Sequence, residues 1–303
     1  MNRYPLTLIH RFPGSFREPF PGPAPALQLR SVLRPSGSRS PFTLSPAEAS
    51  SSTESSRDYL RIQGLDYDGR RRAGESTGGF VDFISRTATS LSVCMGAASA
   101  HRPDSSLIVS GVQTLICGLS ADAVVRPASI AGALNRSVCG AAGDDFYATL
   151  FYAWVDSLRR ELCYVNAGHE PALLLRKRQS RAITLESTGA VLGLTDRSSY
   201  GQRTIPLEPG DVLAVFSEGV AEAIDSLGRP FGSAGVLSVL RRCECARAAD
   251  LVEEILDAAE RHAGRSVPSA DQTVAVVRFT GGMDKAIPAE AETELACAVA
   301  RAS

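Results

Sequence analysis

The chain has 303 residues, a formal net charge of -1 at pH 7 and an apolar content of 44%. This length can bury a substantial core and this composition is typical of a folded globular protein, whereas a nucleic-acid binder usually carries a basic surplus. Because no apolar run approaches the roughly 18 residues of a membrane span and no secretory signal opens the chain, we expect a cytoplasmic protein with no membrane or nucleic-acid partner.

The first 56 residues are rich in Pro, Ser and Arg and have no sustained hydrophobic period. Such a segment buries too little apolar surface to offset the entropy lost on ordering, so residues 1–56 are predicted to be a disordered extension. An organelle transit peptide, which is also rich in Arg and Ser, is the second interpretation. A folded domain over residues 57–280 and a C-terminal tail over residues 281–303 complete the predicted organisation.

The next part of the chain is predicted to contain two strands followed by two helices. Residues 78–85 and 90–97 are predicted strands joined by a short polar turn. From Asp104 onward the apolar residues recur at helical spacing, with Asp104 or Ser105 as the cap. A second helix is expected to start after Pro127, because proline suits the first turn of a helix.

Two hairpins follow. Residues 146–156 and 161–169 read as two long antiparallel strands, and residues 172–176 and 182–186 form a second pair across a basic turn. Strands grouped in hairpins, with helices inserted between the groups, indicate antiparallel sheets covered by helices. The predicted fold class is therefore α+β.

The stretch from residue 207 to residue 223 has a turn signal, then the apolar strand Val212 to Phe216, and then Glu218 at the strand's end. A buried strand fixes such a carboxylate while the next turn exposes it, which suits metal binding. The alternative is that Glu218 merely opens the following helix, where acids are favourable. After this stretch, residues 247–263 are predicted to form an amphipathic helix stopped by a glycine, and residues 273–279 a last buried strand.

Six segments of the chain are informative together: FYATLFYAWVD, YVNAGHEPALLL, TGAVLGL, LEPGDVLAVFSEGVAEAID, LGRPFG and ADQTVAVVRF. In order and spacing they resemble the bacterial PPM-type (PP2C-like) protein phosphatases of the SpoIIE and RsbU group, over about residues 60–280. The resemblance implies an α-β-β-α sandwich of two antiparallel sheets flanked by helices. It also implies a two-metal hydrolase, in which water held by Mg²⁺ or Mn²⁺ attacks phosphoserine or phosphothreonine.

The first two metal-ligand positions that the resemblance implies are altered in this chain. The family's Gly-Gly-Asp is represented by Gly78 and Gly79 without the acid, and Asp82 resembles a later aspartate of the same segment. In the family's Gly-Asp-Val-Ser-Gly-His-Gly, the ligand is replaced by Ala97 and the last glycine by Arg102. Asp82 is therefore the one candidate metal ligand from this half of the site.

The last two ligand positions retain acids, although neither is intact. The family's Thr-Asp-Gly is represented by Ser217, Glu218 and Gly219, and its Asp-Asp-x-Thr keeps only the second acid, with Ala270 before Asp271. The candidate metal ligands are thus Glu218, Asp271 and Asp82. Loss of about three negative charges is expected to weaken the binding of two dications strongly.

His169 follows Asn166, Ala167 and Gly168 and invites a general-acid role. The resemblance instead makes Asn-Ala-Gly-His a structural turn between two strands, and we favour the turn.

Two functions from different classes are consistent with these residues. One is a divergent Mg²⁺- or Mn²⁺-dependent protein serine/threonine phosphatase, which uses a metal ion held by Glu218 and Asp271. The other is a pseudophosphatase that binds a phosphorylated regulatory protein without turnover. In either case the resemblance implies a partner of the anti-sigma-antagonist type in bacterial signalling.

Overall fold

The computed structural model describes residues 61–74, 78–98, 105–120, 125–142, 146–179, 181–243, 246–264, 268 and 270–281. The predicted extension over residues 1–56 and nearly all of the predicted tail lie outside these residues. Arg102 and Asp104, which the sequence analysis named, lie outside them as well.

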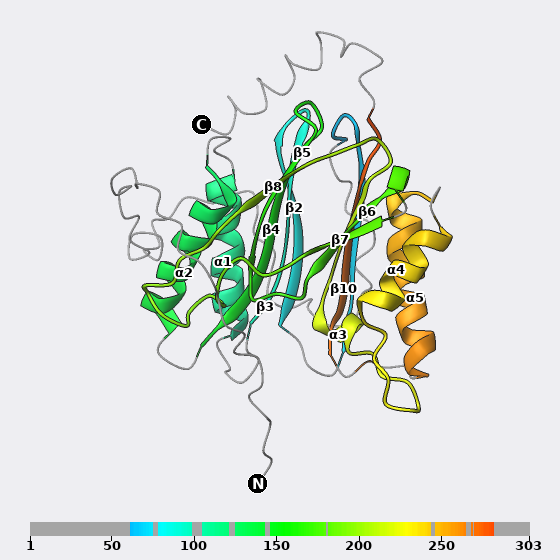
Figure 1. Cartoon of the computed structure of the whole chain (residues 1–303). Helices are drawn as coiled ribbons and strands as arrows, with labels where there is room; N and C mark the ends of the chain where they lie inside the picture. The colour runs from blue at the N-terminus through cyan, green and yellow to red at the C-terminus, as the bar shows by residue number, and fades with distance from the viewer. Residues whose placement is uncertain are drawn as a thin grey trace, which may run out of the picture. The chain divides into compact units, whose positions relative to one another are not determined.

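The described strands form two antiparallel sheets that face each other (Figure 1). The first sheet has the order β1-β10-β9-β6-β7, and its strands are β1 (Leu65–Arg72), β10 (Gln272–Phe279), β9 (Val212–Phe216), β6 (Ala172–Arg176) and β7 (Arg181–Leu185). The second sheet has the order β2-β3-β4-β5-β8, and its strands are β2 (Gly79–Thr87), β3 (Ser90–Ala98), β4 (Ala148–Asp156), β5 (Glu161–Ala167) and β8 (Arg203–Pro206).

Helices cover the outer face of each sheet (Figure 1). The second sheet is covered by α1 (Ser105–Ser120) and α2 (Pro127–Ala142), and the first by α3 (Glu218–Ala221), α4 (Gly232–Arg242) and α5 (Ala248–Ala263). This arrangement confirms the predicted α+β class and the predicted α-β-β-α sandwich. No helix in the described part of the chain is long and apolar enough to cross a membrane.

Strand β9 illustrates why the layers form. Its five residues are all buried, because alternate side chains enter different cores. Leu213 and Val215 belong to the core between the two sheets. Ala214 and Phe216 belong to the core between the first sheet and its helices. A strand that is covered on both faces therefore reads as a continuous apolar run instead of an alternating one.

The structure confirms the two predicted hairpins, since β4 pairs with β5 and β6 pairs with β7. It also contains three elements that the sequence analysis did not predict: β1, β8 and α4. Strand β1 has the sequence LDYDGRRR, whose charged residues obscure the alternation of apolar and polar residues that is typical of a strand. Its partner in the sheet is β10, the last strand, so the pairing depends on residues about 200 positions away.

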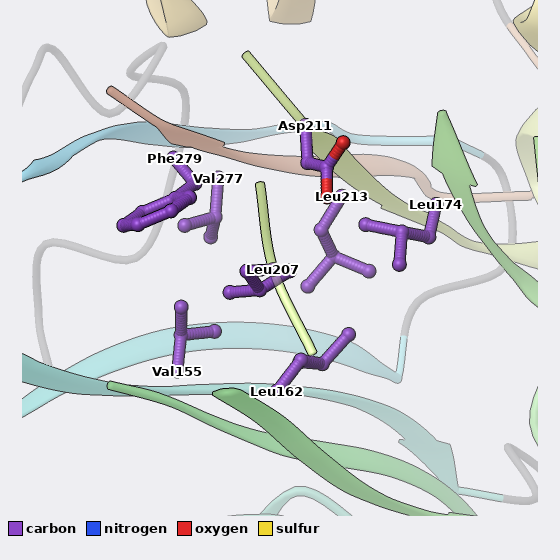
Figure 2. Close-up of a pocket in the computed structure, with 8 residues that line it drawn as sticks. All are labelled: Val155, Leu162, Leu174, Leu207, Asp211, Leu213, Val277 and Phe279. Carbon is purple, nitrogen blue, oxygen red and sulfur yellow. The ribbon is translucent and has the colours of Figure 1, made fainter. Parts of the chain in front are cut away.

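A small apolar cavity lies between the sheets, away from the end of β9 and the start of β10 (Figure 2). Side chains from both sheets and from the loop that carries Leu207 line it. Its one charged residue, Asp211, is 2% exposed, and its Oδ2 accepts hydrogen bonds from Arg176 Nη1 at 2.6 Å and from the Glu208 amide at 2.8 Å. Because this carboxylate is already paired, we interpret the cavity as a structural feature.

Candidate functional site

The candidate site forms where the end of β9 meets the start of β10. Ser217 Oγ donates a hydrogen bond to the carbonyl oxygen of Asp271 at 2.9 Å and accepts one from the Thr273 amide at 2.9 Å. Gly219 lies so close that a Cβ on it would be 2.4 Å from the same carbonyl oxygen. The structure thus brings the segments that carry Glu218 and Asp271 into direct contact. Ser217 and Gly219, the two sequence neighbours of Glu218, make this contact.

The carboxylate of Asp271 is buried and already surrounded by donors. Asp271 is 6% exposed. Its Oδ1 accepts a hydrogen bond from the Gly74 amide at 3.0 Å, and its Oδ2 accepts one from the Gly78 amide at 3.3 Å. Arg71 Nη1 also donates to Oδ2, at 3.2 Å. These donors occupy the oxygen atoms through which a metal ion would bind.

Arg71 reaches Asp271 because of strand periodicity. Residues 70 to 72 are three consecutive arginines in β1, and successive side chains of a strand point to opposite faces. Arg71 lies opposite Thr273 in the β1-β10 register, so its side chain shares the inter-sheet face with Asp271. Arg70 and Arg72 form ion pairs with Glu253 of α5 on the other face. The side chain of Arg71 is 41% exposed.

Glu218 is the first residue of α3 and is exposed. Two other acids, Glu170 and Glu222, lie near it. Burial raises the pKa of Glu170, and the negative charges of Glu218 and Glu222 raise it further. Burial and the charge of Glu218 likewise raise the pKa of Glu222. The sequence analysis named neither Glu170 nor Glu222. Glu222 follows Glu218 by four residues and closes α3, so its proximity is local, whereas the proximity of Glu170 depends on the fold.

Asp82 lies in a different environment. It stands opposite Cys94 in the β2-β3 register, and Cys94 belongs to the core under α1 and α2. Its Oδ2 accepts a hydrogen bond from Gln113 Nε2 of α1 at 2.6 Å. Asp82 therefore faces the outer helices, whereas Asp271 faces the space between the sheets. The structure does not bring these two carboxylates together, and the role of Asp82 as a metal ligand stays a prediction.

The donor set of the described residues does not fit a two-metal centre. No three His, Cys, Asp or Glu residues within the described ranges are close enough to hold a metal ion. Ala97, in β3 opposite Gly79, and Ala270 have no ligand atom in their side chains. Two close dications need several oxygen ligands and compensating negative charge. At this site the charge nearest to Asp271 is the positive guanidinium of Arg71.

His169 is part of the turn that carries the chain from β5 in one sheet to β6 in the other. Its amide donates a hydrogen bond to Asn166 Oδ1 at 2.8 Å, and its Nδ1 lies 3.1 Å from the carbonyl oxygen of Glu170. Gly168 adopts a positive φ of 66°, and a Cβ there would lie 2.4 Å from Val191 Cγ1. The placement agrees with the structural turn that the sequence analysis favoured for His169. Burial lowers the pKa of His169 to about 4.

Solved structures of other proteins share this fold. The RsbU and RsbW domains of a Mycobacterium tuberculosis protein match with a TM-score of 0.62 at 24% identity, over 73% of this chain and 62% of that chain. The catalytic domain of the serine/threonine protein phosphatase PstP, solved in complex with 2 manganese ions, matches with a TM-score of 0.56 at 14% identity, over 71% of this chain and 97% of that chain. The fold is thus that of the PP2C-type phosphatases.

The sequence of the chain shows which family it belongs to. The model for Stage II sporulation protein E (SpoIIE) matches residues 87–280, and the chain belongs to this family. The phosphoserine phosphatase RsbU of Bacillus subtilis is 29% identical over 136 residues, which cover 44% of this chain and 39% of that protein. The match therefore spans well under half the length of this curated relative. The resemblance to a SpoIIE/RsbU-type phosphatase domain, drawn from six segments of the sequence, is confirmed.

Proposed function

We propose that the chain is a SpoIIE-type phosphatase domain that binds a phosphoserine- or phosphothreonine-bearing regulatory protein and has lost turnover with Mg²⁺ or Mn²⁺. One observation carries this proposal: both oxygens of Asp271 are engaged by Arg71 and by backbone amides. Asp271 is the acid that survives at its ligand pair, where Ala270 replaces the other. A metal ion would have to displace a guanidinium from this carboxylate.

Electrostatics supports the loss of metal binding. A dication near Asp271 would be repelled by Arg71, whose Nη1 lies 3.2 Å from the carboxylate oxygen. In an environment of intermediate dielectric, charges separated by a few ångströms interact by several kcal/mol. The missing side-chain oxygens at Ala97 and Ala270 remove the ligands that would offset this repulsion.

The proposed partner is a phosphorylated regulatory protein of the anti-sigma-antagonist type, encountered in the bacterial cytoplasm. The family membership supports this partner class, as does the similarity to a solved pair of RsbU and RsbW domains. The predicted domain over residues 57–280 would supply the binding surface, and it includes the whole family match.

The second candidate is an active phosphatase with one metal ion near Glu218 and Asp271. The mutual influence of Glu170, Glu218 and Glu222 favours it, since three nearby carboxylates make a local excess of negative charge. A hard dication prefers such oxygen ligands. Asp82 would join this set as a further ligand only if β2 changed its orientation.

Turnover of a phosphoserine peptide and of an aryl phosphate, measured across Mg²⁺ and Mn²⁺ concentrations, separates the two candidates. We expect no metal-dependent turnover from the unchanged chain, and turnover from the double variant Ala97→Asp with Ala270→Asp. Ala249→Asp, in the first turn of α5, is the matched control for an added acid. Metal-dependent turnover in the unchanged chain that Glu218→Ala abolishes would establish the active enzyme instead.

A further inference from the structure

We propose that the guanidinium of Arg71 takes the place of the metal ions and binds the phosphoryl group of the phosphorylated partner. This inference rests on the proposed function and names the group that performs the recognition. A phosphoryl group carries negative charge and three acceptor oxygens, which a divalent cation or an arginine fork can engage. In this chain the arginine is present at the carboxylate and the full ligand set for metal is not.

The position of Arg71 is determined by two hydrogen bonds and by its place in the β1-β10 register. Its Nη1 donates to Oδ2 of Asp271 at 3.2 Å and to the carbonyl oxygen of Gly79 at 3.1 Å. Its β10 neighbour in the register is Thr273, which is fully buried. A guanidinium held by a buried carboxylate is already oriented, so less side-chain entropy is lost when it binds an anion.

The same geometry leaves hydrogen-bond donors available. A guanidinium has five N–H groups. Among the described residues, the hydrogen bonds of Arg71 all come from Nη1, so Nε and Nη2 are not engaged there. With 41% of the side chain exposed, these donors can be reached from solvent. Two N–H groups on one planar fork match two oxygens of a phosphate.

The neighbouring arginines cannot do this. Arg70 pairs with Glu253 and lies near Asp68, while Arg72 pairs with Glu253, Asp257 and Glu260. Both lie on the α5 face of the sheet, where these acids compensate their charges. Arg70 is therefore a matched control for Arg71: it has the same chemistry and the same strand, and it lies on the opposite face.

Nearby acids determine which probe is suitable. Glu170, Glu218 and Glu222 are near enough to influence one another electrostatically, and their negative charges would repel free phosphate. A phosphoserine peptide with lysines on both sides of the phosphoserine offers the phosphoryl group to Arg71 and positive charges to the acids. The same peptide with unphosphorylated serine reports binding that is due to the lysines alone.

The test is fluorescence anisotropy of the labelled peptides with the full chain in EDTA. We expect the phosphorylated peptide to bind in the absence of metal, Arg71→Gln to weaken it by about tenfold or more, and Arg70→Gln to leave it unchanged. Thermal unfolding of each variant verifies that it is folded. Equal affinity of Arg71→Gln and the unchanged chain would overturn the inference while leaving the proposed function standing.

A second variant gives an independent result. Asp271→Asn removes the negative charge that competes for Arg71 and retains an acceptor oxygen that keeps the guanidinium oriented, so we expect its affinity in EDTA to equal or exceed that of the unchanged chain. A tenfold loss would overturn the inference. Binding that appears only with Mn²⁺ would also overturn it in favour of a metal site. Absence of binding with and without Mn²⁺ would overturn the proposed function itself.

Discussion

Arg71 in the first strand and Asp271 at the start of the last form an ion pair with an Nη1 to Oδ2 distance of 3.2 Å, between residues 200 positions apart. The arginine is 41% exposed and the aspartate 6%. The pair therefore has a buried end, which the fold holds in place, and an exposed end. This asymmetry makes Asp271 important for stability and leaves Arg71 able to meet a ligand.

Asp271→Ala is expected to lower the free energy of unfolding by about 1–3 kcal/mol, because the amides of Gly74 and Gly78 lose their acceptor. Asp271→Asn keeps one acceptor oxygen and is expected to cost less. Urea unfolding followed by circular dichroism measures both variants. Equal stability of the Ala and Asn variants would show that the amide hydrogen bonds contribute little.

His169 is expected to make the protein less stable in acid. Its folded-state pKa of about 4 lies below the ordinary value of 6.5 because burial disfavours the charged ring. A lowered folded-state pKa means that the unfolded chain binds the proton first, so stability is lost as the pH falls from 6.5 toward 4. His169→Gln should flatten this part of the pH profile of urea unfolding. An unchanged slope would contradict the assignment to His169.

Glu218→Gln is expected to lower the pKa of Glu170 and of Glu222, because it removes a negative charge that raises both. NMR titration of the side-chain carboxyl carbons measures the two shifts, and Glu208→Gln, in the turn before β9, is the control. A raised folded-state pKa of an acid means that stability falls as the pH rises through it, so the variant should lose less stability over that range. If neither pKa moved, the charge of Glu218 would not act on the other two acids.

Gly219→Ala is expected to be destabilising by about 1–3 kcal/mol, because a Cβ would lie 2.4 Å from the carbonyl oxygen of Asp271 and 2.9 Å from that of Ala270. Gly118→Ala is the matched control. Nothing in the described chain lies within 4 Å of a Cβ at Gly118 in α1, so there the change should stabilise by up to about 1 kcal/mol through helix propensity. Thermal unfolding distinguishes the two signs. A stabilising Gly219→Ala would mean that the contact between the end of β9 and the start of β10 can open.

Most strands and three helices were predictable because their signals are local. The hairpins have apolar strands joined by short polar turns, and α5 has an apolar stripe together with Gly264 in a left-handed conformation at its end. Strand β1 was missed because its outward Arg70 and Arg72 are matched to acids of α5 and its inward Arg71 to Asp271. Those partners are distant in the sequence, so the local pattern resembles a charged loop.

By itself, the sequence determined the α+β class, the family and the replacement of ligand positions by Ala97 and Ala270, because periodicity and residue identity are properties of the chain. Only the tertiary structure decided which acids meet. It placed Asp82 against α1, brought Glu170 near Glu218, and paired Arg71 with Asp271. The physical reason is that the neighbours of a strand residue depend on the register of its strand. The register of β1 is established by pairing with β10, which lies at the other end of the domain's sequence.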